Sequence, residues 1–342
     1  MTTKMTLGAA AIAATALVAG VAAQTQQING AGATFPAPIY TKWFSEYNKL
    51  HSNVQINYQP IGSGGGIRQI TNQTVFFGAT DGPMTNDQLL AAPSKIYHFP
   101  MVLGADVPVY NIPGVTASLK FSGPLLADIY LGKITKWNDP QITKLNAGIT
   151  LPATDITVVH RSEASGTTYI WVDYLSKVSA EWKTKAGVAT QVNWPTGVGG
   201  KGNEGVSGLV TQTPGSIGYV ELIYALQNKI SYGSVQNMGG EFVKASVASV
   251  TAAASSAASS MPADFRVSIT NAPGKGVYPI SSFTWLLLYQ DPKDKAQAKT
   301  MVDFVKWALK DGQKYCADLG YAPLPANVVQ MERTALGKIK VG

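Results

Sequence analysis

Short β-type runs alternate with helix-type segments along almost the whole chain, and this alternation favours an α/β architecture. The run NVQINY alternates apolar and polar residues, and VFFGA, KIYHF, VPVYN, ITVVH, SIGYV and FTWLLLY are further strand candidates. Helix-type periodicity marks APIYTKWFSEYNKL, GPLLADIYLG, TTYIWVDYLSKV and AQAKTMVDFVKWALKD. In the first of these, one face collects Ile39, Tyr40, Trp43, Phe44, Tyr47 and Leu50. We expect this aromatic and aliphatic face to pack in a core.

The first 23 residues, MTTKMTLGAAAIAATALVAGVAA, have the features of a secretory signal peptide. A single lysine, Lys4, precedes an apolar stretch of small residues that ends in a cleavage-type pattern, Val21-Ala22-Ala23. No other uninterrupted apolar run is long enough to span a membrane, and no cysteine follows the cleavage pattern to carry a lipid anchor. We therefore expect an unanchored protein that is exported to the periplasm, with full secretion as the alternative.

The 319 residues after residue 23 are more than one core usually holds, and they suit two lobes. In VPVYNIPGV an apolar strand ends in a Pro-Gly segment before a new α/β series begins, and in NAPGKGVYPISS Pro and Gly cluster again. We place a first lobe at residues 24–105, a second at 106–274, and a return segment of the first at 275–342. Residues 246–260, SVASVTAAASSAASS, predict a surface helix with a polar face.

The composition is that of a globular protein, with 45% hydrophobic and 14% charged residues and a formal net charge of +7. The basic residues are spread along the chain without a run that could follow a nucleic acid backbone, so we expect no nucleic acid partner. Cys316 is the only cysteine, which excludes an internal disulfide. We expect it to be a small buried residue on a helical pattern with Trp307, Ala308 and Tyr315.

Four segments share one pattern: the end of a strand, then small or hydroxyl-bearing residues, then the start of a helix. In NGAGATFPAPIY, Thr34 and Phe35 precede prolines that suit a first helical turn. In IGSGGGIRQI, Ser63 lies in a glycine run, and in FFGATDGPMTND, Asp81 directly follows a strand. The fourth segment, HRSEASGTTY, follows the strand-like DITVV and contains Arg161, Ser165, Gly166 and Thr167.

These residue types together suit a small anion. Helix starts carry unpaired N–H groups and a partial positive charge, hydroxyls add neutral donors, and arginine offers a planar charged fork. The known phosphate loops do not fit, because GSGGGI lacks the third glycine of a dinucleotide fingerprint and GGKGNEG lacks the Ser or Thr that should follow Gly-Lys. We therefore expect a free small anion rather than a nucleotide.

Seven segments, in order and spread over nearly all of the expected mature chain, resemble the periplasmic phosphate-binding proteins of the phosphate ABC transporter, the PstS family. The segments are GAGATFPAPIYTKWFSEY, GSGGGIRQI, FGATDGPM, LGKITKWNDPQI, VVHRSEASGTT, GNEGVSGLVTQTPGSIGYVE and DGQKYCADLGYAPLP. The resemblance implies a two-lobe periplasmic binding protein of type II, in which each lobe is a mixed sheet flanked by helices and hinge strands cross between the lobes.

The resemblance also implies the binding residues. Those expected from the first lobe are Thr34, Phe35, Ser63 and Asp81, and those from the second are Arg161, Ser165, Gly166 and Thr167. Phe35 and Gly166 would bind through their backbone N–H groups. The implied function is high-affinity binding of inorganic phosphate by a monomer, and its delivery to the membrane permease and ATPase of the transporter.

Asp81 is expected to select protonated oxyanions, since phosphate keeps a proton near neutral pH and sulfate does not. A nearby Arg161 would favour the ionised form of Asp81. Variation from the family pattern at Thr80, Gly82, Glu163 and Ala164 removes no expected ligand. Binding of another oxyanion, such as sulfate, molybdate or a phosphonate, remains the alternative.

A secreted phosphatase is the alternative from another class of protein. It would need a metal cluster or an activated nucleophile, but the only histidines, His51, His98 and His160, have no metal-ligand spacing. The segment GVSGL has leucine where a nucleophile elbow needs glycine. His160 is expected to pack in or near a sheet instead of activating Ser165. We therefore expect a binding protein that is not an enzyme and holds no cofactor or metal.

Overall fold

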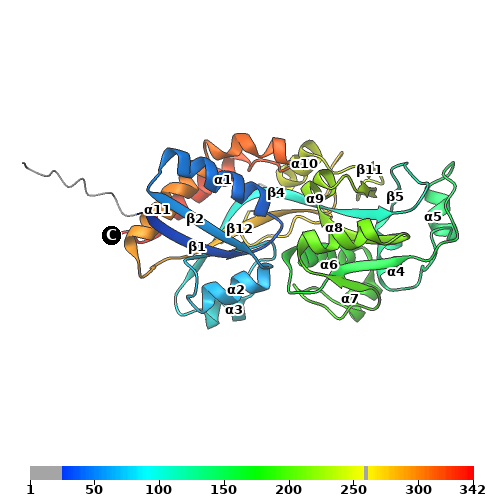
Figure 1. The fold of residues 1–342 in the computed structure, drawn as a ribbon, viewed down its shortest axis with the longest axis horizontal. Helices are drawn as coiled ribbons and strands as arrows, with labels where there is room; N and C mark the ends of the chain where they lie inside the picture. Colours follow the sequence, from blue (N-terminus) through cyan, green and yellow to red (C-terminus); the bar gives the residue numbers. More distant parts are fainter. Residues whose placement is uncertain (1–24, 258–260) are drawn as a thin grey trace, which may run out of the picture.

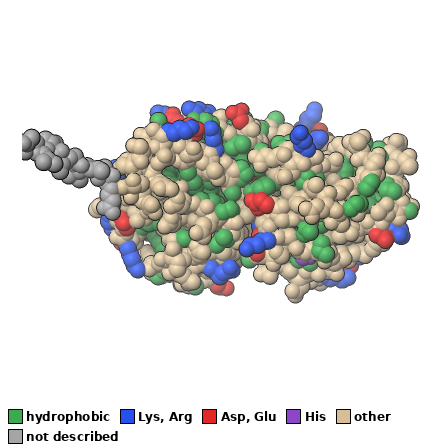
Figure 2. Space-filling model, viewed as in Figure 1, with side chains coloured by type: hydrophobic (Ala, Val, Ile, Leu, Met, Phe, Trp, Pro, Cys, Tyr) green, Lys and Arg blue, Asp and Glu red, His purple; other side chains and the backbone are tan. Residues whose placement is uncertain are grey.

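The chain folds into two lobes that lie end to end, as a computed structural model describes for residues 25–257 and 261–342 (Figure 1). The expected signal peptide, residues 1–23, lies outside the described residues, and so does the end of the low-complexity segment, residues 258–260. No helix within the described part is long and apolar enough to cross a membrane. Lys and Arg side chains are scattered over the visible face without forming one basic patch (Figure 2).

The first lobe is built from both ends of the chain. Its N-terminal elements are β1 (Gln26–Gly32), α1 (Ala37–Leu50), β2 (Val54–Pro60), α2 (Ser63–Thr71), β3 (Phe77–Thr80) and α3 (Asn86–Ala91). Its C-terminal elements are β12 (Ser281–Tyr289), α11 (Lys295–Ala308), the short 3₁₀ helices η2 (Gly312–Tyr315) and η3 (Ala317–Leu319), and α12 (Ala326–Leu336).

The second lobe comes from the middle of the chain. Its elements are β5 (Lys120–Phe121), α4 (Gly123–Tyr130), α5 (Pro140–Leu145), β6 (Thr157–Arg161), α6 (Gly166–Val178), α7 (Ala180–Lys185), β7 (Val198–Gly200), α8 (Gly202–Gln212), β8 (Ser216–Glu221), α9 (Leu222–Gln227), β9 (Ser231–Tyr232), β10 (Ser234–Gln236) and β11 (Phe242–Val243). Helix α10 (Val247–Ala257) follows, and strand β4 (Ile96–Asn111) runs through both lobes.

One path of strands runs through both lobes in the order β2-β1-β3-β12-β4-β8-β6-β7. The outer strands of each lobe pair in parallel, as β2-β1-β3 and β8-β6-β7, whereas β12 and β4 pair antiparallel with their neighbours. A smaller sheet has the order β11-β10-β5. The prediction of two α/β lobes, each a mixed sheet flanked by helices, is confirmed.

Strand β4 is one continuous strand, although KIYHF and VPVYN predict two separate ones. The prediction is wrong because Pro100, which has no N–H to donate, does not end the strand. Opposite Pro100 the register of β12 shifts between Thr284 and Trp285, and this irregularity lets the pairing continue. Strand β4 pairs with β12 as far as Ala105 and with β8 from Asp106 onward.

The chain passes twice between the lobes at neighbouring positions. Ala105, where β4 leaves β12, lies opposite Ser281, the first residue of β12. The N–H of Asp106 donates to the carbonyl oxygen of Ile280 at 2.9 Å, which ties the two crossings together. The lobe limits expected from the sequence, 24–105, 106–274 and 275–342, stay a prediction.

Most of the expected helix faces are buried. Helix α1 buries Ile39, Tyr40, Trp43, Phe44 and Tyr47, but Leu50 is 63% exposed because the helix ends there. Cys316 is buried as predicted, and burial raises the pKa of its thiol to about 12. It lies between η2 and η3 and not on a helix with Trp307, because α11 ends at Ala308.

Helix α10 confirms the helix expected within residues 246–260. Its face formed by Val250, Ala253 and Ala254 is buried, and the helix packs against β4 and β12. Ser255 and Ser256 are exposed. The small residues therefore let this helix lie close to the strands that cross between the lobes.

Candidate anion-binding site

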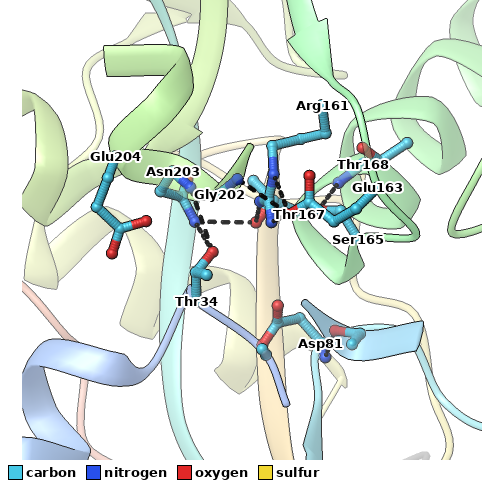
Figure 3. A network of polar contacts seen from close by, with 12 residues as sticks. Thr34, Asp81, Arg161, Glu163, Ser165, Thr167, Thr168, Gly202, Asn203 and Glu204 are labelled. Carbon is cyan, nitrogen blue, oxygen red and sulfur yellow. Dashed lines mark hydrogen bonds and ion pairs between the residues drawn. The ribbon is translucent and has the colours of Figure 1, made fainter. Parts of the chain in front are cut away.

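The four loops singled out in the sequence meet between the lobes (Figure 3). Because β1, β2 and β3 are parallel, their carboxyl ends lie at one edge of the sheet, and the segments after them carry Thr34, Ser63 and Asp81. In the second lobe β6 ends at Arg161, and α6 begins at Gly166. The local strand–loop–helix pattern thus positions every expected site residue at one junction.

The lobes touch directly at this junction. The N–H of Gly64 in α2 donates to the carbonyl oxygen of Ala164 at 2.9 Å. A Cβ atom added to Gly166 would lie 2.5 Å from Oγ of Ser63 and 2.6 Å from Oδ2 of Asp81, so a larger residue would force the lobes apart. The expected side chains are at most 3% exposed: Thr34, Ser63, Asp81, Arg161, Ser165 and Thr167.

The start of α6 supplies backbone donors to this junction. Oγ of Ser165 caps the helix by accepting from the N–H of Thr168 at 3.1 Å. The N–H groups of Gly166 and Thr167 belong to the first turn, where no earlier turn offers them a carbonyl. The positive end of the helix dipole therefore lies beside Asp81.

Phe35 contributes to the core with its side chain. The ring is completely buried, and a Cβ atom added to Gly104 of β4 would lie 2.5 Å from it. The Phe35 carbonyl accepts from the Tyr321 hydroxyl at 2.6 Å. The ring and the carbonyl are thus engaged within the protein, and the role of the Phe35 N–H that the family resemblance implies stays a prediction.

The Arg161 guanidinium is buried and held from two sides. Its Nη1 donates to Oγ1 of Thr167 at 3.0 Å, and its Nε donates to Oε1 of Glu163 at 3.0 Å. Its Nη2 also forms an ion pair with Oε1 of Glu163. Oε1 of Glu163 accepts a further hydrogen bond from the N–H of Gly202 at 3.0 Å. This network fixes the orientation of the fork that faces the junction.

Sequence reasoning missed the role of Glu163, which it treated as loop variation. The carboxylate lies two residues after Arg161 and balances its charge at close range. With Asp81 ionised, the three groups Arg161, Glu163 and Asp81 carry a formal charge of −1, and with Asp81 protonated they carry none. Neutral donors must therefore supply much of the attraction for an anion. The Arg-x-Glu spacing was the available signal.

Asn203 at the start of α8 is the second residue that was missed. It is completely buried, and its Nδ2 donates to Oγ1 of Thr34 at 2.8 Å and to Oγ1 of Thr167 at 3.2 Å (Figure 3). Its Oδ1 accepts from the N–H of Glu221 at 2.9 Å. Asn203 thus joins the two lobes. The sequence analysis used the segment GNEG only to exclude a nucleotide-binding loop and to support the family resemblance, and it assigned no role to Asn203.

Asp81 is the buried acid that the first lobe brings to the junction. Burial raises the pKa of Asp81 to about 7, although hydrogen bonding from Thr284, the charge of Arg161 and hydrogen bonding with Ser63 all lower it. Arg161 therefore acts in the expected direction, but desolvation outweighs it. Oδ1 accepts from Oγ1 of Thr284 at 2.8 Å, whereas Oδ2 is buried without a hydrogen-bond partner among the described residues.

His160 packs against the second lobe's aromatic side chains. Its ring stacks on Trp194 with the ring centroids 4.7 Å apart, and its Nδ1 lies 3.0 Å from the carbonyl oxygen of Arg161. Burial lowers the pKa of this imidazole. These contacts match the packing role expected for His160.

Two α/β lobes that enclose a buried polar junction define the class of solute-binding proteins. In agreement, a family model described as the PBP superfamily domain matches residues 18–311. Two curated relatives are more specific, and both are named phosphate-binding protein PstS. The one from Xylella fastidiosa is 51% identical over 305 residues, which cover 89% of this chain and 83% of the relative. The one from Pasteurella multocida is 49% identical over 308 residues, covering 90% and 89%.

The chain therefore belongs to the family of phosphate-binding proteins PstS, within the PBP superfamily. The relatives are named as binding proteins, which is a non-enzymatic role. Solved structures support the fold. A high-affinity periplasmic phosphate-binding protein bound with phosphate, PfluDING, aligns with a TM-score of 0.74 at 22% identity, covering 90% of this chain and 93% of that one. A phosphate-binding protein from Stenotrophomonas maltophilia aligns with a TM-score of 0.69 at 20% identity and the same coverage.

Proposed function

We propose that the chain binds one inorganic phosphate ion between its lobes and delivers it to the permease of a phosphate ABC transporter. The observation that carries this proposal is a set of buried donor groups at the junction that also holds Oδ2 of Asp81, a carboxylate oxygen without a hydrogen-bond partner in the part of the chain that the structure describes. The names of the relatives support phosphate as the ligand.

In this proposal the phosphate oxygens accept from every expected site residue except Asp81. The charged donor is Arg161, the hydroxyl donors are Thr34, Ser63, Ser165 and Thr167, and the backbone donors include Phe35 and Gly166. Each hydrogen bond to a charged group contributes about 1.5–3 kcal/mol, and exclusion of water strengthens the interaction. Because Glu163 offsets the charge of Arg161, these neutral donors supply much of the binding free energy.

Asp81 acts as the selective group. A phosphate hydroxyl donates to Oδ2 of Asp81, which has no other hydrogen-bond partner within residues 25–257 and 261–342. Sulfate has no proton to donate, so two acceptors would face each other when Asp81 is ionised. Leaving such a buried group unpaired costs about 1–3 kcal/mol or more, and a site built on a required hydrogen bond can reject an analogue by roughly 10⁴–10⁵.

Isothermal titration with phosphate, sulfate and arsenate tests the proposal. We expect tight phosphate binding at pH 8, arsenate as the strongest competitor because it carries a similar proton, and little uptake of sulfate. The Asp81→Asn variant should reduce discrimination against sulfate by at least tenfold, since its amide can donate to sulfate. Equal affinity of the unaltered chain for sulfate and phosphate would rule out the proposed ligand selectivity.

A matched control separates this effect from a simple loss of charge. Asp87 lies six residues further on and is exposed in the first turn of α3. We expect the Asp87→Asn variant to keep the affinities of the unaltered chain for both ions within about twofold, because an exposed charge is screened by salt. A change of selectivity in this variant would show that Asp81 acts only through net charge.

Delivery follows from the two-lobe construction. Phosphate would favour the arrangement in which both lobes touch, since its donors come from both sides. The permease would then recognise the joined surface of the two lobes. The expected leader at residues 1–23 supports export, and we propose that the carrier acts as a monomer.

A further inference from the structure

A threonine hydroxyl has one hydrogen and two lone pairs, so its acceptor bonds decide where its hydrogen can point. Oγ1 of Thr34 accepts from Nδ2 of Asn203 at 2.8 Å and from the N–H of Asn203 at 3.3 Å. Oγ1 of Thr167 accepts from Nη1 of Arg161 at 3.0 Å and from Nδ2 of Asn203 at 3.2 Å. Each oxygen therefore has two donors aimed at it, and each hydroxyl hydrogen must turn elsewhere.

The Asn203 amide cannot easily rotate to reverse this pattern. Its Oδ1 accepts from the N–H of Glu221 at 2.9 Å, so its oxygen faces β8 and its NH₂ group faces the threonines. Both hydrogens of Nδ2 are used, one for Thr34 and one for Thr167. The side chain is completely buried, and a buried donor without an acceptor would destabilise the folded protein. The orientation is thus determined by protein groups alone.

We propose that Asn203 is a positioning residue that makes the hydroxyls of Thr34 and Thr167 donate into the binding site. This inference rests on the proposed function and assigns a cause to its selectivity for acceptor oxygens. Without Asn203 either hydroxyl could rotate and present a lone pair to the anion. Asn203 also makes this arrangement depend on lobe contact, because Thr34 and Thr167 belong to different lobes.

The Asn203→Asp variant tests the inference with almost no change of shape. The new carboxylate only accepts, so the hydroxyl hydrogens of Thr34 and Thr167 should turn toward it and away from phosphate. We expect the phosphate affinity at pH 8 to fall at least 100-fold by isothermal titration. The control is Asn138→Asp, at an exposed position of the second lobe, for which we expect less than a threefold change.

A pH profile separates positioning from mere packing. Protonation of the introduced carboxyl restores one donor, so the affinity ratio between the unaltered chain and the Asn203→Asp variant should shrink as the pH falls from 8 to 5. The Asn203→Ala variant has no group to protonate there, and its ratio should stay constant. The charged groups around this position are present in all three proteins and cancel in the ratios: Asp81, Arg161, Glu163, Glu204 and Glu221.

A double-mutant cycle decides the matter if the Asn203→Asp variant does not fold. Asn203→Ala should weaken phosphate binding about tenfold or more in the unaltered background. It should weaken binding much less in a background that carries Thr34→Val and Thr167→Val, where no hydroxyl is left to turn. Equal losses in both backgrounds would overturn the inference.

The outcomes distinguish the inference from the proposed function. If the unaltered chain takes up no phosphate, the proposed function fails and the inference fails with it. If the unaltered chain binds phosphate and the Asn203→Asp variant binds it equally well, only the role of Asn203 is overturned.

Discussion

At the scale of single residues, the decisive property of Asp81 is that burial raises its pKa to about 7. This carboxyl group therefore changes its charge near neutral pH, where an exposed aspartate is fully ionised. A protonated Asp81 has a hydrogen to donate, whereas an ionised Asp81 can only accept. The selectivity of the proposed site consequently depends on pH.

We predict that sulfate binding strengthens as the pH falls. Because the pKa is raised, the protonated form is populated below pH 7, and only this form can donate to sulfate. About a tenth of the Asp81 carboxyls are protonated at pH 8 and most are at pH 6, so the apparent sulfate affinity should rise about tenfold. Titration calorimetry at both pH values measures this change, and the Asp81→Asn variant should lack it. A sulfate affinity of the unaltered chain that does not change with pH contradicts the assignment.

The sequence was most informative about residues in the loops that directly follow strands. Thr34, Ser63 and Asp81 follow strand ends, and such positions converge in any parallel sheet. Glu163 and Asn203 were not assigned roles, because their contacts depend on the three-dimensional arrangement of other loops. Asn203 is 169 residues away from Thr34 in the sequence, and a local sequence pattern cannot predict a hydrogen bond over that separation.

At the scale of elements, the crossing strand β4 carries a buried acid at the point where it changes partners. Asp106 on β4 lies opposite Glu221 on β8 in the strand register, and both are completely buried. Burial is the main cause that raises the pKa of both groups well above the ordinary values, and the charge of Asp81 raises both further. The charge of Glu221 adds to the rise for Asp106. Both carboxylate oxygens of Asp106 lack partners among the described residues.

We predict that the Asp106→Asn variant is more stable than the unaltered chain at high pH. A carboxyl whose pKa is raised by folding favours the folded state below its unfolded pKa, and this contribution is lost as the pH rises through the folded pKa. Urea unfolding should therefore show an advantage of about 1–3 kcal/mol for the variant at pH 9 that shrinks at pH 5. The control is the exposed Asp318, for which Asp318→Asn should show no such trend. A constant difference between pH 5 and pH 9 would contradict this origin.

Most strands and helices of this chain could be predicted, and the errors have physical causes. Helix α1 was predicted with its full length because its aromatic stripe is regular. Strand β4 was predicted as two separate strands, but it continues through Pro100, because Met101 bulges where Trp285 pairs with Pro100 and Thr284 pairs with Val102. The short strands β5, β7 and β9 to β11 have two or three residues each and leave no periodicity to read.

At the scale of the whole molecule, few protein contacts hold the binding loops of one lobe against the other. The Tyr224 hydroxyl of α9 donates to the carbonyl oxygen of Thr34 at 2.6 Å, and Gly64 and Ala164 share a backbone bond. Asn203 adds its bond to Thr34. A bound anion would connect donors of both lobes and stabilise the same arrangement.

We predict that the Tyr224→Phe variant releases phosphate faster without losing selectivity. The substitution removes one hydrogen bond between the lobes and leaves every proposed phosphate donor in place. A typical hydrogen bond contributes about 0.5–1.5 kcal/mol, so the dissociation rate should rise roughly two- to tenfold. Stopped-flow release into a phosphate trap measures this rate. The ratio of phosphate to sulfate affinity should stay unchanged, and an altered ratio would instead place Tyr224 in the site.

The two-lobe organisation was predictable from chain length and from the resemblance of the loops, but the lobe contacts were not. Tyr224 and Thr34 are 190 residues apart, and the tyrosine lies in a helix whose sequence shows only a packing pattern. The contacts between the lobes depend on how the two lobes pack together in the folded protein, and the sequence alone does not predict that geometry.

Strand β12 lies between β3 and β4 although it comes near the end of the chain. A polypeptide that emerges from the ribosome with its N-terminus first would thus expose β3 and β4 without their common neighbour. The middle stretch, in contrast, brings β8, β6 and β7 together early. The order of emergence makes the lobe with both termini the last to mature, and a nascent chain stalled before Ser281 would present unpaired strand edges to chaperones and proteases.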